Sequence, residues 1–89
     1  MNTTYINEVK RINEAAAFFA CRGYHTATSF GNCCHSLDVT VYFYKAELKK
    51  HLERYLRRFA NENDKIEYVE LTRENGDKFY TLQLSKYIS

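Results

Sequence analysis

The first quarter of the chain follows the hydrophobic period of a helix. Between residues 5 and 21, apolar side chains fall on one broad face of a helical wheel. These positions are Tyr5, Ile6, Val9, Ile12, Ala16, Ala17, Phe19 and Ala20. Thr4 is suited to cap the start of this helix. Arg22 and Gly23 are suited to end it, because glycine readily takes a left-handed conformation. The pattern predicts a helix over 5–21.

Two residues depart from this pattern. Phe18 falls on the polar side, where a large ring lowers solubility unless something covers it. A partner, a second copy of the chain or the adjacent hairpin would provide cover, although single exposed apolar residues are also common. Phe18 is therefore a candidate partner-binding residue. Asn13 lies inside the apolar arc, where we expect it to hydrogen-bond to the backbone.

The next segment changes to the period of a strand. Residues 24–30 are rich in Thr and aromatic residues, and Gly31-Asn32 marks a turn. Residues 37–44 then alternate strictly between apolar and outward positions. The apolar set is Leu37, Val39, Val41 and Phe43, and the outward set is Asp38, Thr40, Tyr42 and Tyr44. The two segments are predicted to form strands.

The second half repeats this layout. Residues 45–61 carry one helical stripe, formed by Leu48, Leu52, Tyr55, Leu56 and Phe59. Residues 65–72 and 78–88 are strand candidates around Glu74-Asn75-Gly76-Asp77, where Asn-Gly predicts a hairpin with both central residues at positive φ. The apolar residues of 65–72 point to both faces, so this strand is either buried on both sides or carries a bulge.

The order α-β-β-α-β-β indicates an α+β fold in a single domain over residues 1–89. The simplest architecture is one four-stranded antiparallel sheet with two helices packed on one face. The other face of the sheet is then open to water or to a partner.

Composition narrows the class of protein. Of the 89 residues, 45% are hydrophobic and 27% are charged, which is the composition of a globular protein. The chain has no proline, and no segment has the composition of a linker. The start lacks the pattern of a signal peptide, and no apolar run approaches the roughly 20 residues that cross a bilayer. Three cysteines, two of them adjacent, make a poor disulfide framework and fit a reducing compartment. We expect a cytoplasmic protein.

The second helix carries a concentration of positive charge. The net charge is +2, but residues 45–58 hold six Lys and Arg against two Glu. Lys50, Arg54 and Arg57 lie opposite the apolar stripe, with Arg58 at the flank. There they would neutralise phosphates in a salt-dependent way. The alternative is an ordinary solvated face with Glu53–Arg57 as an i,i+4 pair.

The outward tyrosines are a second candidate contact. Tyr42 and Tyr44 could stack on bases or anchor a protein partner. The RNA-recognition signature is absent from every strand, and the two rings could instead cover each other. We expect the open face and the basic residues of the second helix to form one contact surface.

A Cys/His cluster is the third candidate: Cys21, His25, Cys33, Cys34 and His35. It holds no C-x₂-C pair for zinc and no orienting residue for a Cys–His nucleophile, so we interpret these cysteines as small buried hydrophobes near a turn. Gly-rich phosphate loops and the common hydrolase and metalloprotease motifs are also absent. We predict no enzyme, no metal and no cofactor.

These features favour a protein that binds another macromolecule. In size, lone-domain organisation and mixed α/β layout, the chain resembles the host-directed inhibitors of bacteriophages and mobile elements, such as anti-CRISPR proteins. The resemblance implies a steric inhibitor of a protein or ribonucleoprotein complex in a bacterial cytoplasm, which competes for a functional, nucleic-acid-binding surface. The alternative is a small nucleic-acid-binding regulator that uses the basic helix at 45–61.

Overall fold

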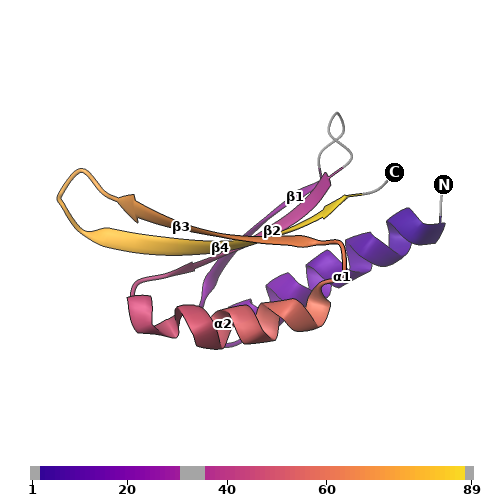
Figure 1. The fold of residues 1–89 in the computed structure, drawn as a ribbon, viewed down its shortest axis with the longest axis horizontal. Coiled ribbons are helices and arrows are strands. Elements are labelled where there is room, and N and C mark those ends of the chain that lie inside the picture. Colours follow the sequence, from indigo (N-terminus) through magenta and orange to yellow (C-terminus); the bar gives the residue numbers. More distant parts are fainter. Residues whose placement is uncertain (1–2, 31–35, 88–89) are drawn as a thin grey trace.

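The computed structural model describes residues 3–30 and 36–87 and has an α+β fold (Figure 1). The elements are α1 (Thr3–Ala20), β1 (His25–Phe30), β2 (Ser36–Phe43), the 3₁₀ turn η1 (Ala46–Leu48), α2 (Lys49–Leu56), the 3₁₀ turn η2 (Arg57–Phe59), β3 (Lys65–Thr72) and β4 (Lys78–Tyr87). The predicted order α-β-β-α-β-β is confirmed. The predicted Gly31-Asn32 turn lies outside the described residues.

The four strands form one antiparallel sheet with the order β1-β2-β4-β3. Strand β1 pairs with β2 and β3 pairs with β4, and β2 pairs with β4 to join these two halves of the sheet. The strands β1 and β3 are therefore the edges of the sheet.

Both helices lie on one face of the sheet (Figure 1). The apolar residues of β2 point toward them, so Leu37, Val39, Val41 and Phe43 are buried as predicted. Leu82 and Leu84 of β4 lie beside them across the central strand pair. The rest of the core comes from the helices, as Ile12, Ala15, Phe19, Leu52 and Leu56.

The buried face of α1 differs from the predicted one. Asn13, Ala17 and Ala20 are exposed, whereas Ala15 is buried. The physical reason is that α1 packs against α2 as well as against the sheet, which turns its buried face toward Ala15 and Phe18. Asn13 therefore faces solvent and has no need of the expected backbone bond. Helix α1 begins at Thr3, one residue before the position predicted as its cap, Thr4.

Phe18 is covered by the second helix. Its ring centroid lies 5.5 Å from that of Tyr55 and 5.6 Å from that of Phe59. The Arg22 guanidinium lies 3.5 Å from the ring centre of Phe18 and donates to the carbonyl of the same residue. Phe18 thus lies between the helices, on the covered side of the sheet, and the chain itself supplies the cover that its position in sequence requires.

Gly23 ends α1 as predicted. Its φ is +88°, its amide donates to the carbonyl of Ala20, and the amide of Tyr24 donates to the carbonyl of Phe19. These two bonds satisfy carbonyls of the last helical turn in a Schellman motif.

The hairpin between β3 and β4 is confirmed, but its turn differs from the prediction. The Gly76 amide donates to the carbonyl of Arg73, so the central residues are Glu74 and Asn75, and not Asn75 and Gly76. Gly76 follows at φ +92°, and the Arg73 amide donates to the carbonyl of Asp77. A turn followed by a left-handed glycine is the common longer form of a hairpin connection.

The edge strand β3 pairs with β4 in regular register over its whole length. It therefore carries no bulge, and only one of its faces is covered. Ile66 and Tyr68 pack on the core, while Val69 and Leu71 are exposed on the opposite face.

Candidate functional site

The sheet face opposite the helices is the candidate site, and we call it the open face. No helix of residues 3–30 and 36–87 covers it. Strand alternation and register assign it the following residues: His25, Ala27 and Ser29 of β1; Ser36, Asp38, Thr40 and Tyr42 of β2; Phe79, Thr81, Gln83, Ser85 and Tyr87 of β4; and Lys65, Glu67, Val69 and Leu71 of β3.

Aromatic side chains gather at one end of the open face. Tyr42 lies between His25 and Phe79, with ring centroids 5.1 Å and 6.5 Å away. The arrangement follows from register, because Tyr42 pairs with His25 on one side and with the small Thr81 on the other, next to Phe79. Large rings can therefore flank Tyr42 on both sides.

Arg73 extends this cluster to Tyr44. Its guanidinium donates to Tyr44 Oη at 2.9 Å and lies 5.4 Å from the ring centres of both Tyr44 and Phe79. The contact fixes a hydrophobic ring whose residue is 62% exposed. We call His25, Tyr42, Tyr44, Arg73 and Phe79 the ring cluster.

Two exposed aliphatic residues of β3 continue this surface to the sheet edge. Val69 is 42% exposed and Leu71 is 39% exposed, and Leu71 lies directly across from Phe79. Contiguous exposed apolar surface is typical of an interaction site in a monomer. The ring cluster together with Val69 and Leu71 is called the aromatic patch.

The open face outside this patch is polar but carries little net charge. Its centre holds small or neutral side chains, among them Thr40, Thr81 and Gln83. The Lys65 ammonium bonds the Glu67 carboxylate at 2.6 Å, and this hydrogen bond raises the pKa of Lys65 above 10.5. The two opposite charges lie in contact, so the pair adds little net field to the open face.

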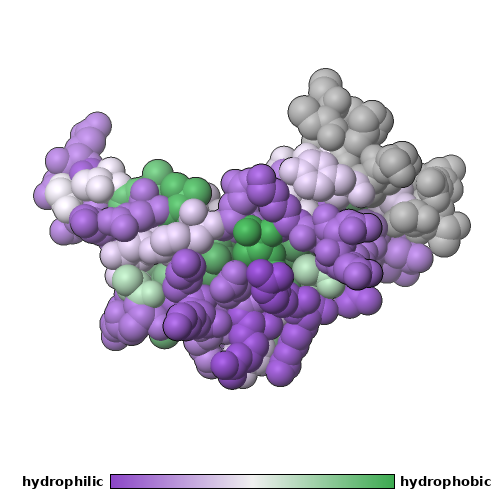
Figure 2. All heavy atoms as spheres, in the orientation of Figure 1, coloured by the Kyte–Doolittle hydropathy of each residue, from purple (hydrophilic) through white to green (hydrophobic). Residues whose placement is uncertain are grey.

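The basic residues of α2 and η2 lie on the other side of the molecule. Lys50, Arg54, Arg57 and Arg58 are exposed, as predicted, and we call them the basic ridge. Leu52 and Leu56 of α2 point into the core beneath the sheet, so the ridge points away from it. Figure 2 shows mainly hydrophilic side chains over α2, and a hydrophobic group on the upper side of the sheet near the β3–β4 hairpin, whose tip is hydrophilic. The expectation that the outward tyrosines and the basic residues share one surface is therefore wrong.

Two ridge residues already have intramolecular contacts. Arg57 pairs with Glu53 at 3.3 Å, which is the predicted i,i+4 pair. The Arg58 guanidinium lies 4.7 Å from the ring centre of Tyr55. These contacts leave Lys50 and Arg54 as the ridge residues for which the structure shows neither an ion pair nor a cation–π contact within the described part of the chain.

The Cys/His cluster is only partly described. Cys33, Cys34 and His35 lie outside the described residues. Cys21 is exposed and not buried, because it follows the last turn of α1, and His25 belongs to the ring cluster. Among residues 3–30 and 36–87, no three His, Cys, Asp or Glu side chains come together as a metal site would require.

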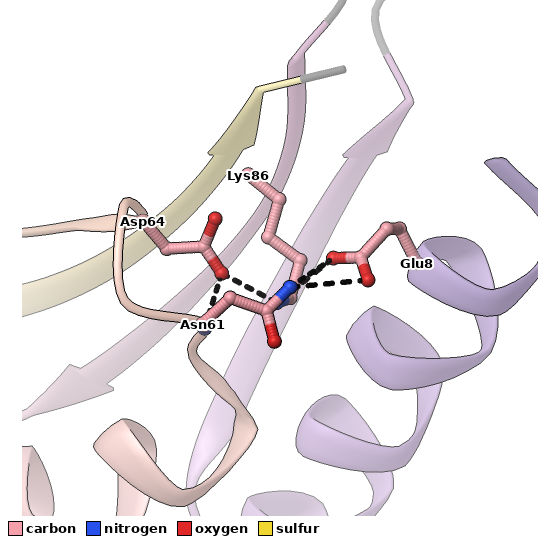
Figure 3. A network of polar contacts seen from close by, with 4 residues as sticks. All are labelled: Glu8, Asn61, Asp64 and Lys86. Atoms are coloured by element: carbon pink, nitrogen blue, oxygen red, sulfur yellow. Dashed lines mark hydrogen bonds and ion pairs between the residues drawn. The ribbon is translucent and has the colours of Figure 1, made fainter. Parts of the chain in front are cut away.

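The sequence pattern also missed a buried charge. Lys86 follows Leu82 and Leu84 on the core face of β4, and its side chain is 1% exposed. Its ammonium bonds Asp64 at 2.6 Å and Glu8 at 3.0 Å, and Asn61 donates to Glu8 as well (Figure 3). The network joins three parts of the chain: helix α1, the segment between η2 and β3, and strand β4. We assign it a structural role.

Phe79 and Arg73 were missed as members of the candidate site. Phe79 could have been found from the alternation of 78–88, since Leu82 and Leu84 point to the core and odd-numbered residues point away. Arg73 could not, because its contact with Tyr44 joins segments 29 residues apart.

Comparison of the chain with family models, curated proteins and solved structures finds no match. No helix in the described residues has the length and apolar character needed to cross a membrane.

Proposed function

We propose that this chain is a non-catalytic binding protein that docks on a protein partner through the open face, with the aromatic patch as its anchor. The observation that carries the proposal is the cluster of rings and exposed aliphatic residues on the sheet face that no described helix covers. Small α+β domains bury one sheet face, and an aromatic surplus on the other face suits a contact.

The charge of the open face favours protein over nucleic acid as the partner. Direct phosphate contact needs several cations on one surface. The lysine and arginine of the open face, Lys65 and Arg73, lie at opposite ends of β3, and Lys65 is paired with Glu67. The cores of protein interfaces are depleted in charge and enriched in Tyr, Phe and Arg, and the aromatic patch has this composition.

As its mode of action, we propose steric inhibition in the manner of the host-directed inhibitors that the chain resembles. A protein without a catalytic device acts by occupying a surface that its partner needs for nucleic acid or for another subunit. The open face, with its small polar centre and apolar end, suits such a contact.

The test is capture of a partner from a nuclease-treated bacterial lysate. The wild type is compared with Leu71→Ser combined with Phe79→Ser, which removes two apolar members of the patch. The control is Arg54→Glu combined with Arg57→Glu on the basic ridge. We expect the first double variant to lose the captured protein and the second to keep it, with both variants folded by circular dichroism. Retention by the first variant would contradict the proposal.

A second candidate function is supported by the basic ridge. Lys50, Arg54 and Arg57 follow one line along α2 and η2, with successive rises of about 6 and 4.5 Å along a helix. This line could follow a nucleic-acid backbone. Titration of labelled duplex DNA against salt tests the idea, because each phosphate contact adds about −0.9 to the slope of log K against log salt. A slope shallower than about −1 would exclude it.

A further inference from the structure

A hollow lies at the end of the β1–β2 pair, beside the ring cluster. Its volume is about 310 Å³ and its walls include Tyr24, His25, Tyr42, Tyr44, Lys45 and Leu48. This volume is at the lower end of the range for ligand pockets, about 300–1,000 Å³, and suits a single bulky group.

The hollow follows from the path of the chain. The β1–β2 pairing ends at His25 and Tyr42, and the two segments diverge beyond it. On one side, Gly23 turns the chain at φ +88° from α1 into β1, and no other atom lies within 4 Å of where its Cβ would be. On the other side, Tyr44 and Lys45 lead away to η1.

The walls define the chemistry of an occupant. They are mostly apolar, with aromatic rings from three tyrosines and the side chain of Leu48. The basic side chains of the lining are His25 and Lys45, and the lining includes no carboxylate. Arg73 adds a further cation next to Tyr44. The hollow therefore combines an apolar interior with a basic rim.

We propose that this hollow receives a bulky apolar side chain of the partner protein, and that carboxylates flank this side chain in the partner's sequence. The inference rests on the proposed function and names the anchor of that contact. Binding energy at protein interfaces concentrates where one large side chain fills a pocket. Carboxylates beside it meet Lys45, His25 and Arg73, and charge complementarity selects the partner segment.

A nucleotide is the alternative occupant, because it combines a planar base with an anionic phosphate. Its base carries hydrogen-bonding groups on its edges, and mostly apolar walls leave such groups unpaired at a cost. The apolar character of the walls therefore favours an amino-acid side chain.

The experiment uses the full chain labelled with ¹⁵N and four small probes. The probes are acetyl-Glu-Glu-Phe-Glu-Glu-amide, the same peptide with Ala for Phe, the same peptide with Lys for every Glu, and adenosine monophosphate. We expect the acidic Phe peptide to bind about tenfold or more tightly than the Ala and Lys peptides, since it buries a ring next to opposite charge. Amide shifts should centre on Tyr24, His25, Tyr44 and Leu48.

Charge reversal at the rim supplies a matched control. Lys45→Glu should weaken the acidic Phe peptide and strengthen its Lys counterpart. Arg58→Glu reverses a charge on the basic ridge, ten residues beyond Leu48 and so roughly 15 Å along the helix. It should leave both affinities within about twofold, because exposed charges more than about 10 Å apart are largely screened at 0.1 M salt.

Four results would overturn the anchor: no shift with the acidic Phe peptide, equal affinity for the Phe and Ala peptides, shifts centred on the basic ridge, or tighter binding of adenosine monophosphate in the hollow. Leu71 and Phe79 do not line the hollow, so the capture experiment stays independent. If capture depends on these two residues but the acidic Phe peptide does not bind the hollow, the proposed binding function is supported and the anchor is rejected. If the peptide binds the hollow but capture ignores Leu71 and Phe79, the proposed function fails instead.

Discussion

Lys86 is the residue at the centre of the buried polar network with Glu8, Asn61 and Asp64. Its buried ammonium compensates two carboxylates, Asp64 and Glu8, which come from different parts of the chain. Taking charges out of water is costly, and the cost is offset only while all members of the network remain.

Replacement of Lys86 by Met should therefore destabilise the fold by about 3–5 kcal/mol, because it leaves two carboxylates with no cation near them. Urea unfolding followed by circular dichroism measures the loss. Lys65→Met is the matched control, since it breaks an exposed ion pair with Glu67 on the same sheet and should leave the unfolding midpoint unchanged. Equal effects of the two substitutions would show that the network contributes no stability.

Gly23 is the residue at which backbone conformation decides stability. Gly23→Ala places a side chain at φ +88° with no steric neighbour, so the cost is conformational alone. We expect a loss of about 1–2 kcal/mol. Gly23→Asn should retain most of the stability, because asparagine tolerates the left-handed region. Thermal unfolding of both variants gives the comparison, and equal stability of wild type and the Ala variant would refute a conformational requirement.

At the scale of elements, most of the fold could be predicted because several segments have an unambiguous period. The alternation of residues 37–44 leaves one choice of face, and the run 65–72 is bounded by turn residues. Helix α1 was harder, because alanine fits either a buried or an exposed position and its many alanines widen the apparent apolar arc. Only the contact of Phe18 with Tyr55 and Phe59, which joins two helices, fixes the true face.

This interhelical contact has a measurable consequence. Phe18→Ala should destabilise the protein by about 2 kcal/mol, less than the 3–5 kcal/mol for a fully buried Phe, since the ring is half-buried. Ile6→Ala on the exposed part of α1 is the control and should cost less than about 1 kcal/mol. Chemical denaturation distinguishes them. A negligible effect of Phe18→Ala on the free energy of unfolding would mean that the ring is exposed to solvent, as its position on the polar side of the helix suggests, and does not pack against the second helix.

The candidate site was predictable in part, for a reason that also lies at this scale. Tyr42 and Tyr44 are placed outward by the alternation of their own strand. Phe79, Arg73, Val69 and Leu71 join them only through the register of β4 with β2 and of β3 with β4, which local periodicity does not contain.

The whole molecule has two sides of different character. The aromatic patch lies on the open face, whereas the basic ridge lies beyond the helices on the covered face. A chain with a net charge of +2 thus carries an exposed apolar surface on one side and a cationic one on the other.

The fold should not depend on the cationic side. Arg54→Glu combined with Arg57→Glu breaks only the exposed pair with Glu53, and exposed pairs contribute little to stability. We expect an unchanged melting temperature by differential scanning fluorimetry. A fall of more than about 5 °C, which corresponds to roughly 1 kcal/mol in a domain of this size, would show that the ridge supports the fold.

The most direct test of the open face as the contact surface is oxidative footprinting of the captured complex, read by mass spectrometry against the free protein. We predict that Tyr44, Leu71 and Phe79 lose reactivity on binding. Tyr55, which lies on α2 between Phe18 and Arg58 on the covered side of the sheet, should react as before. Protection of Tyr55 with unchanged reactivity at Tyr44, Leu71 and Phe79 would place the partner on the helices and contradict the account.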